Sequence, residues 1–442
     1  MCRISPWARE YSPRVRCIAS LILLVCFTGC ARRLSSPETR SVTALIWSAG
    51  GRANIDHTLI EEFTEQTGIA VHLIPASESS SQRLQQEVTL LKHQSSAVDV
   101  FQIDTTWPAL LAPYLLDLRS SLTDRIEDEV PEIVENATFN HRIVAAPFLV
   151  GYGLLYFRKD LLHKYGFSHP PRTWSELESQ SQRIQAGERK ARQKDFWGYV
   201  WQGAEYEGLT CNALEWQYSQ GGGNFVTADR RANVANRQAV RAFSRAAHWI
   251  GTISPPGVTA YVEEDSRNLW QSGHAAFLRN WGYVYPLAKQ SREVGTRFSV
   301  APLPSAENTH SSVLGGWYLG ITTATRHRLE ALAFVKYMTS EAVERRRAIY
   351  GGFSPTLSSA YRDPAVLRSN EIFASIADIA KRAVRRPASV TGAAYGCISV
   401  AYAHGVHEIL TGEATAQAAT ANMQSALQKI LQTPPDPAGS CR

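Results

Sequence analysis

The chain has 442 residues, of which 44% are hydrophobic and 10% aromatic, and its formal net charge is +6. This length can supply cores for two domains of ordinary size. Four arginines and one glutamate in the first thirty residues carry half of that charge. The remainder is too weakly basic for a typical nucleic-acid-binding protein.

The N-terminus carries an export signal. Basic residues through Arg16 precede the apolar run "CIASLILLVCFTGC", which ends at Cys30. A dozen or so apolar residues are too few for a membrane-spanning helix, which needs roughly 20. The pattern predicts a signal peptide over residues 1–30. "FTGC" resembles a bacterial lipobox, in which Cys30 is lipidated; an uncleaved membrane anchor is the alternative. Both place the protein outside the cytoplasm, in the periplasm or on the cell surface, held to a membrane.

The next residues, 31–40, are polar and predict a flexible tether. Beyond the signal segment the chain keeps only Cys211, Cys397 and Cys441, at no metal-like spacing. One disulfide among them is possible in an oxidising compartment, but the sequence does not select the pair. No metal site is expected.

The first half of the mature chain alternates between strand and helix patterns. Apolar periodicity predicts strands over 42–47, 69–74 and 98–104 and helices over 55–68 and 81–94. Such alternation indicates an α/β domain with a largely parallel sheet. Ligands of these sheets bind at the carboxyl ends of strands, where Asp104 lies.

A second α/β pattern begins near residue 144 and includes a helix that starts at a capping box of Thr173 and Glu176. Further helices are expected over 236–250 and 263–277, a strand over 297–304, apolar alternation over 311–325, and mainly helix beyond. Strands from distant sequence blocks predict a chain that crosses between two lobes more than once and leaves a cleft between them.

Aromatic and acidic residues are densely mixed in residues 196–218, which hold seven aromatic side chains and three glutamates. Aromatic rings can bury the apolar face of a hexose, and charged groups can replace the water bound to its hydroxyls. This composition suits a saccharide site. We expect part of the segment to line the cleft and Leu214 and Trp216 to pack in the core.

No metalloprotease, serine-hydrolase, dithiol or phosphate-loop motif occurs. One enzymatic alternative stays open, because glycoside hydrolases place two carboxylates around the scissile bond. Glu205 and Glu207, or either one with Asp104, could form such a pair in a secreted or lipid-anchored enzyme acting on α-glucosides. A purely structural surface lipoprotein is a third possibility.

Several longer motifs carry a family resemblance. "WQGAEYEGLTCNALEW", "RNLWQSGHAAFLRNWGYVYPLA", "LGGWYLGI" and "GGFSPT" occur in this order. Together they resemble the family 1 solute-binding proteins of ABC sugar importers, and most of all the trehalose/maltose-binding lipoprotein branch. The resemblance covers about residues 41–430, which is essentially the whole mature chain.

The resemblance implies an α/β, two-lobed periplasmic-binding-protein fold of type II, with a ligand cleft between the lobes. It implies a monomer that is not an enzyme, needs no cofactor, and delivers a disaccharide such as trehalose or maltose to membrane permease subunits. The approximate lobes are residues 41–147 with 295–340, and residues 148–294 with 341–442.

The resemblance also implies ligand-binding residues, transferred by position: Arg83, Asp104, Tyr206, Glu207, Trp281, Tyr283, Gly316, Trp317 and Arg386. Trp281 and Tyr283 match stacking aromatics of the family, and Asp104 matches an acceptor of sugar hydroxyls. Many trehalose-binding members carry Asp or Asn where this chain has Gly151. Two alternatives follow: the preferred sugar differs from trehalose, or Tyr152 compensates for the lost hydroxyl contact.

Overall fold

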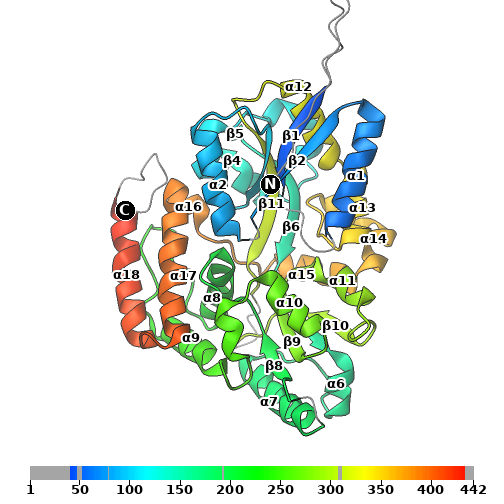
Figure 1. Ribbon diagram of the computed structural model, residues 1–442. Helices are drawn as coiled ribbons and strands as arrows, with labels where there is room; N and C mark the ends of the chain where they lie inside the picture. The colour runs from blue at the N-terminus through cyan, green and yellow to red at the C-terminus, as the bar shows by residue number, and fades with distance from the viewer. Residues whose placement is uncertain (1–39, 47–51, 78, 192–193, 307–310, 434–442) are drawn as a thin grey trace, which may run out of the picture. The chain divides into compact units, whose positions relative to one another are not determined.

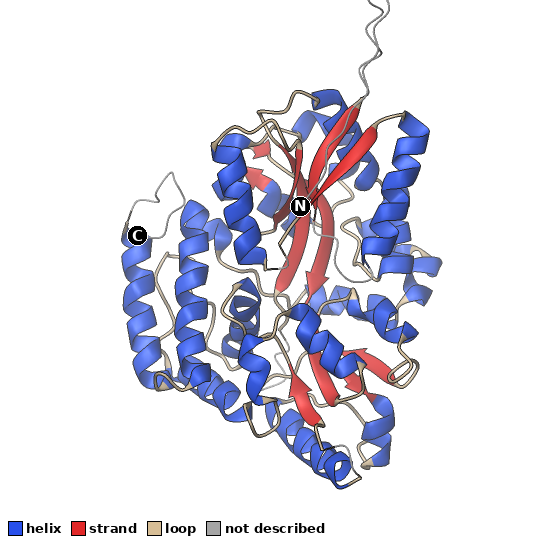
Figure 2. Cartoon of the chain, in the orientation of Figure 1, coloured by secondary structure: helices blue, strands red, loops and turns tan. Residues whose placement is uncertain are grey.

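The computed structural model describes residues 40–46, 52–77, 79–191, 194–306 and 311–433. Within these ranges the chain forms two main β-sheets flanked by helices (Figure 1), and Figure 2 shows the strands of both sheets among the helices that cover them. No helix in the described ranges is both long and apolar enough to cross a membrane. The predicted signal peptide, with Cys30, lies outside the described residues.

The first sheet has five strands, in the spatial order β2 (Ala70–Pro75), β1 (Ser41–Ile46), β3 (Val100–Asp104), β11 (Leu314–Ile321) and β6 (Ala146–Tyr152). The strands β1, β2 and β3 run parallel, whereas β11 runs antiparallel to both β3 and β6. Every residue of β3 is buried, as expected for a central strand covered on both faces.

Helices pack against the first sheet through regular apolar faces. In α1 (Arg52–Thr67) the side chains of Leu59, Ile60 and Phe63 are buried. This helix packs on α12 (Arg328–Met338) and α13 (Glu341–Gly351). The helix α2 (Ser80–Lys92) begins where the side chain of Ser79 accepts a hydrogen bond from the amide of Gln82. In Figure 1, α1 and α13 lie on one side of this sheet and α2 on the other.

The second sheet has four strands, in the order β10 (Phe298–Ala301), β7 (Leu154–Arg158), β9 (Ala275–Asn280) and β8 (Trp197–Val200). Its helices include α7 (Trp174–Lys190), α8 (Glu207–Ser219), α9 (Arg237–Trp249), α17 (Tyr395–Thr411) and α18 (Ala416–Gln432). The helix α8 packs on both α9 and α17, and nearly all of its residues are buried. A helix enclosed in this way has no clear amphipathic pattern.

One predicted helix is shorter than expected. The helix predicted over 263–277 ends in the structure as α10 (Glu263–Gln271), and β9 starts at Ala275. Gly273 adopts φ 86°, a left-handed conformation that ends the helix. The apolar residues that follow belong to a central strand, and a short apolar run does not reveal by periodicity whether it is helix or strand.

The predicted lobe boundaries differ from the structure at three places. Residues 148–152 were assigned to the second lobe, but as part of β6 they pair with β11 in the first sheet. Residues 298–301 were assigned to the first lobe, but as β10 they pair antiparallel with β7 in the second sheet. Residues 341–351 were assigned to the second lobe, but as α13 they pack on α1.

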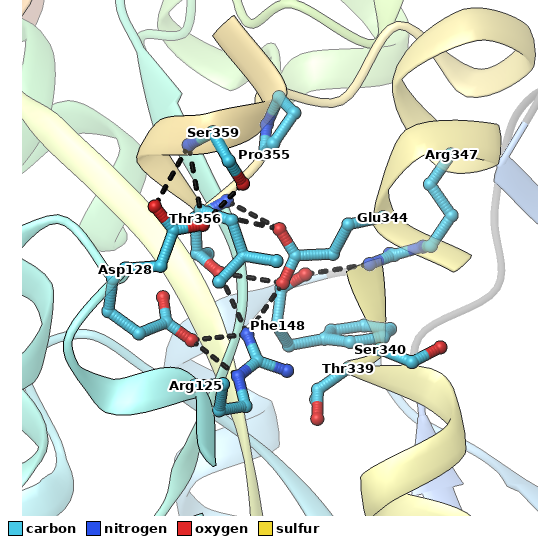
Figure 3. A network of polar contacts seen from close by, with 12 residues as sticks. Arg125, Asp128, Phe148, Thr339, Ser340, Glu344, Arg347, Pro355, Thr356 and Ser359 are labelled. Atoms are coloured by element: carbon cyan, nitrogen blue, oxygen red, sulfur yellow. Dashed lines mark hydrogen bonds and ion pairs between the residues drawn. The ribbon is translucent and has the colours of Figure 1, made fainter. Parts of the chain in front are cut away.

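A polar network holds Thr356 against α13 and the segment 125–129 (Figure 3). Glu344 accepts hydrogen bonds from the amide of Thr356 at 2.8 Å and from Nη2 of Arg125 at 2.8 Å. Arg125 also donates through Nε to Glu129 at 2.7 Å. A charged network out of water is stable only when its members satisfy one another.

This network predicts a pH dependence of stability. Burial raises the pKa of Glu129 to about 7, although the charge of Arg125 lowers it. The unfolded carboxyl titrates near about 4.3, so the folded state holds an extra proton between these values and the free energy of unfolding falls as the pH rises through this window. Because Glu129→Gln cannot ionise, we expect its free energy of unfolding relative to the wild type to rise by roughly 1–3 kcal/mol between about pH 5 and about pH 8.

Urea denaturation at the two pH values measures this difference. Glu127→Gln, an exposed position in the same turn, is the control and should show no such rise. A difference between Glu129→Gln and the wild type that stays constant with pH would contradict the buried-carboxyl assignment.

Candidate functional site

A cavity with an empty volume of about 840 Å³, including space open to solvent, is lined by residues of both sheets. The first sheet contributes residues from β3, β6 and β11, and the second contributes the segment that follows β9. Nine of the eleven predicted ligand-binding residues line it: Arg83, Asp104, Gly151, Glu207, Trp281, Tyr283, Gly316, Trp317 and Arg386.

Arg386 joins the two sides of the cavity. Its Nη2 lies 2.9 Å from Oδ1 of Asp104, at the end of β3, and donates to the hydroxyl of Thr105 at 2.8 Å. Its Nη1 lies 2.7 Å from Oε1 of Glu207, the first residue of α8. All three charged side chains are at most 10% exposed. One buried guanidinium therefore forms an ion pair with a carboxylate from each side, and removing it would leave both carboxylates without this counter-charge.

Glu207 is bound from several directions. The hydroxyls of Tyr395 and Ser399, both on α17, donate to its carboxylate. Burial raises the pKa of Glu207, while the charge of Arg386 lowers it. Its backbone amide donates to the hydroxyl of Ser81 on α2 at 3.2 Å, a second contact between the two sides of the molecule. Three donors on a carboxylate leave little further acceptor capacity.

Asp104 keeps one oxygen for a further partner. Its Oδ1 accepts from the amide of Thr106 at 2.9 Å and from the Thr106 hydroxyl at 2.7 Å, in addition to Arg386. In the described part of the chain these bonds all go to Oδ1. Because Asp104 lines the cavity, its Oδ2 is the acceptor best suited to a ligand hydroxyl.

Trp317 lies beside Asp104, since the two residues are partners in the register of β11 and β3. The guanidinium of Arg83 lies 4.5 Å from the centroid of the Trp317 ring. Arg83 is itself held by the carbonyl of Ser77, to which its Nε and Nη2 donate at 3.1 and 2.7 Å. The ring of Trp107 packs edge-on against Trp317 at 5.7 Å. These contacts fix the Trp317 ring before any ligand arrives.

Trp281 follows β9 and faces the cavity from the second sheet. Its Nε1 donates to Oε1 of Glu263 at 3.3 Å, and the guanidinium of Arg279 lies 4.0 Å from its ring centroid. Tyr283 donates its hydroxyl to Glu264 at 2.7 Å. The cavity thus has an indole ring on each side, and both rings are held by neighbouring charged groups.

Two predicted residues do not line the cavity. Tyr152 is buried on β6 one residue after Gly151, and successive side chains of a strand point to opposite faces. Tyr206 precedes α8 and donates its hydroxyl to Oε2 of Glu263 at 2.6 Å. Its ring is buried, so it supports Glu263 rather than lining the cavity itself.

Glu263 is the charged lining residue that the sequence reasoning missed. It opens α10 within a run of three acidic residues, which reads as an ordinary helix start. Its contacts with Trp281 and Tyr206 depend on the return of the chain through β9, so no local signal marks it.

The aromatic segment 196–218 divides between site and core. Only Glu207, Gly208 and Cys211 of this segment line the cavity. Trp201 and Trp216 pack edge to face at 4.9 Å, and Trp216 and Leu214 are buried in the core, as predicted. Most of the aromatic residues thus stabilise the second sheet instead of meeting ligand.

The structure partly answers which cysteines form the disulfide. Cys211 is a buried free thiol, whereas Cys397 is disulfide-bonded. The disulfide of Cys397 therefore does not involve Cys211. Cys441 lies outside the described residues.

Comparison with known proteins decides the family. Residues 51–345 match the profile of the bacterial extracellular solute-binding protein family. A probable ABC transporter-binding protein of Deinococcus radiodurans is 39% identical over 373 residues, which are 84% of this chain and 89% of the relative. The chain belongs to this family. It is an extracellular solute-binding protein and not an enzyme.

Two further similarities bear on the fold and the ligand. Maltose-bound MalE3 of T. maritima superposes with a TM-score of 0.83 at 32% identity, covering 88% of this chain and 99% of that one. This places the chain in the two-sheet periplasmic-binding-protein fold. A probable amino-acid ABC transporter periplasmic-binding protein of Sinorhizobium fredii is 25% identical over 375 residues, covering 81% of this chain and 80% of the relative.

The family membership removes the glycoside hydrolase alternative, and the geometry agrees. Asp104 and Glu207, two members of the suggested carboxylate pairs, bind the same guanidinium of Arg386. Glu205 lies 3.1 Å from His404 and does not line the cavity. A general acid must carry a proton toward the scissile bond, which a carboxylate held by an arginine does poorly.

Arg386 gives a stability prediction. We expect Arg386→Met to lower the free energy of unfolding by about 3–5 kcal/mol, because Asp104 and Glu207 stay buried without a counter-charge. Arg385→Met is a matched control, since the neighbouring Arg385 forms an exposed ion pair with Glu135; such pairs contribute about 0–1 kcal/mol. Urea denaturation measures both variants.

The sign of the pH effect provides a second check on Arg386→Met. Without the arginine the folded-state pKa of Glu207 rises further, so acid relieves the defect and the loss relative to the wild type shrinks between about pH 7 and about pH 5. Equal losses for the two arginine variants would show that Arg386 does not neutralise the pair.

Proposed function

We propose that this protein binds an α-glucoside disaccharide, such as maltose or trehalose, and delivers it to the permease of an ABC importer. The observation that carries the proposal is the cavity itself. Trp317 from the first sheet and Trp281 from the second both line it, together with the charged groups of Asp104 and Arg83. Apolar rings combined with charged hydrogen-bonding groups match a pyranose, which has apolar faces and a rim of hydroxyls.

The polarity of the cavity agrees with this ligand class. Oδ2 of Asp104 is open to a hydroxyl donor. The buried Nε of Arg386 has no hydrogen-bond partner within the described residues, and a hydroxyl oxygen is a suitable acceptor for it.

The similarity to MalE3 supports a sugar ligand, because that structure at 32% identity holds maltose. The Sinorhizobium relative, named for amino acids, is more distant at 25% identity. An amino-acid ligand would need paired recognition of an ammonium and a carboxylate group. The chain's membership in the trehalose/maltose branch is part of this proposal. The exact sugar is part of it too, because Gly151 has no side chain that could accept a hydrogen bond from a sugar hydroxyl.

We extend the proposal to the assembly. The two sheets with their helices are the two lobes. A bound sugar stabilises the conformation in which it makes the most contacts, which is the closed one. The permease recognises this closed form. The lipobox-like sequence ending at Cys30 supports a lipid anchor that keeps the protein at the membrane beside the permease.

A ligand panel tests the function. We expect maltose or trehalose to raise the melting temperature without being consumed, because a ligand at a hundredfold excess over Kd adds about 2.7 kcal/mol to the free energy of unfolding. Differential scanning calorimetry measures the shift, and chromatography of the sugar checks for turnover. A rise with amino acids alone would contradict the sugar assignment, and glucose release would contradict the binding role.

Trp281 provides the residue-level test. Trp281→Ala should weaken sugar binding by on the order of 1–3 kcal/mol through the loss of ring contact. Trp197→Ala is a matched control, because Trp197 lies on β8 outside the cavity, is also partly buried, and also has an arginine, Arg189, over its ring at 4.4 Å. Isothermal titration calorimetry measures both affinities. If the two variants bind equally well, Trp281 is not a ligand contact.

A further inference from the structure

The Trp281 ring is held by groups from both sides of the cavity. From the second sheet, the guanidinium of Arg279 lies 4.0 Å from the ring centroid, and Glu263 accepts a hydrogen bond from the indole nitrogen at 3.3 Å. The ring also packs against both of the hydrophobic clusters that form the cores of the molecule. Since Arg279 covers one face, only the other face is open to a ligand.

Arg279 is itself fixed in place. It is 1% exposed, and Glu215 on α8 accepts from its Nε at 2.9 Å and from its Nη2 at 2.6 Å. Gln202 accepts from its Nη1 at 3.2 Å. A guanidinium bound at three nitrogens cannot follow a moving ring, so it sets the plane in which the Trp281 ring lies.

From the first sheet, the ring meets bare backbone. Gly151 on β6 and Gly315 on β11 are register partners, so their Cα atoms face each other across the two strands. A Cβ built on Gly315 would lie 3.1 Å from Cζ3 and 3.2 Å from Cη2 of Trp281. A Cβ built on Gly151 would lie 3.6 Å from Cε3. Carbon atoms pack best at about 3.5–4.0 Å, so a methyl group at Gly315, but not one at Gly151, requires the ring to move by a few tenths of an ångström.

We propose that Gly315 is a positioning residue, which lets the Trp281 indole reach the first sheet and so places its open face where the ligand binds. This inference rests on the sugar-binding function proposed above. It also gives the ligand class more detail. At this point the cavity offers a flat ring and no side-chain acceptor at residue 151, which suits a pyranose with equatorial hydroxyls and a clear C–H face.

Ring position can be measured without any ligand. The full-length protein labelled with 5-fluorotryptophan gives ¹⁹F resonances, and Trp281→Phe identifies the signal of Trp281 by its loss. We expect Gly315→Ala to shift this signal, since the added methyl displaces the ring, and Gly151→Ala to shift it less. Gly257→Ala is the control, because its Cβ would meet the ring of Tyr261 at an ordinary 3.6 Å outside the cavity. An unmoved Trp281 signal in Gly315→Ala would overturn the proposal.

Binding then separates ring displacement from a direct clash with the ligand. Titration calorimetry with maltose should show weakening on the order of tenfold for Gly315→Ala, the usual effect of overpacking by one methyl group. In a Trp281→Phe background, which lacks Cζ3 and Cη2, the same substitution should cost much less. Equal losses in both backgrounds would overturn the proposal, because Gly315 would then act without the ring.

The two proposals fail in different ways. If the wild type binds no sugar in the panel, the sugar function fails, and the resonance shift alone decides whether Gly315 sets the ring position. If sugar binds but Gly315→Ala changes neither the signal nor the affinity, the function stands and the inference about Gly315 is wrong. Should Gly315→Ala not fold, the double variant Gly315→Ala with Trp281→Phe carries the test: recovery of folding supports the proposal, because phenylalanine lacks Cζ3 and Cη2, and failure to fold in both backgrounds overturns it.

Discussion

The site depends on one buried cation. Arg386 lies between Asp104, at the end of the central strand of the first sheet, and Glu207, at the start of the most enclosed helix of the second. Each carboxylate alone would be costly to bury, and together they would repel. The guanidinium makes their proximity favourable and orients both. The two α/β units thus share a defined charge contact beside the cavity.

The sequence alone predicted those parts of the fold and the site whose secondary structure follows from local apolar periodicity. The strand and helix alternation of residues 41–104 predicted most of the first sheet, and the end of a buried strand correctly placed Asp104 at the cavity. Trp281, Trp317 and Arg386 came from motif position, not from any pattern of their own. All three line the cavity, and Trp317 does so as the register partner of Asp104.

Other features depend on contacts between distant parts of the chain. The strand β9 resembled the end of a helix because its apolar run has no flanking alternation, and only its pairing with β7 and β8 makes it a strand. The strand β10 joined the second sheet because the edge of β7 was free for it. Glu263 entered the site through the same long-range pairing. Tyr206 and Tyr152 show the reverse, since adjacency in sequence to a lining residue does not bring a side chain to the same surface.

Gly153 is the residue through which the chain leaves β6 for β7, and so the first sheet for the second. A methyl group there would fall 2.0 Å from Oε1 of Glu215, within the ion pair that this carboxylate makes with Arg279. The two sheets are therefore joined at this passage by main chain alone, lying directly on a pair of opposite charges. Any side chain at this position would have to displace the carboxylate of Glu215, and with it the ion pair that keeps Arg279 in place.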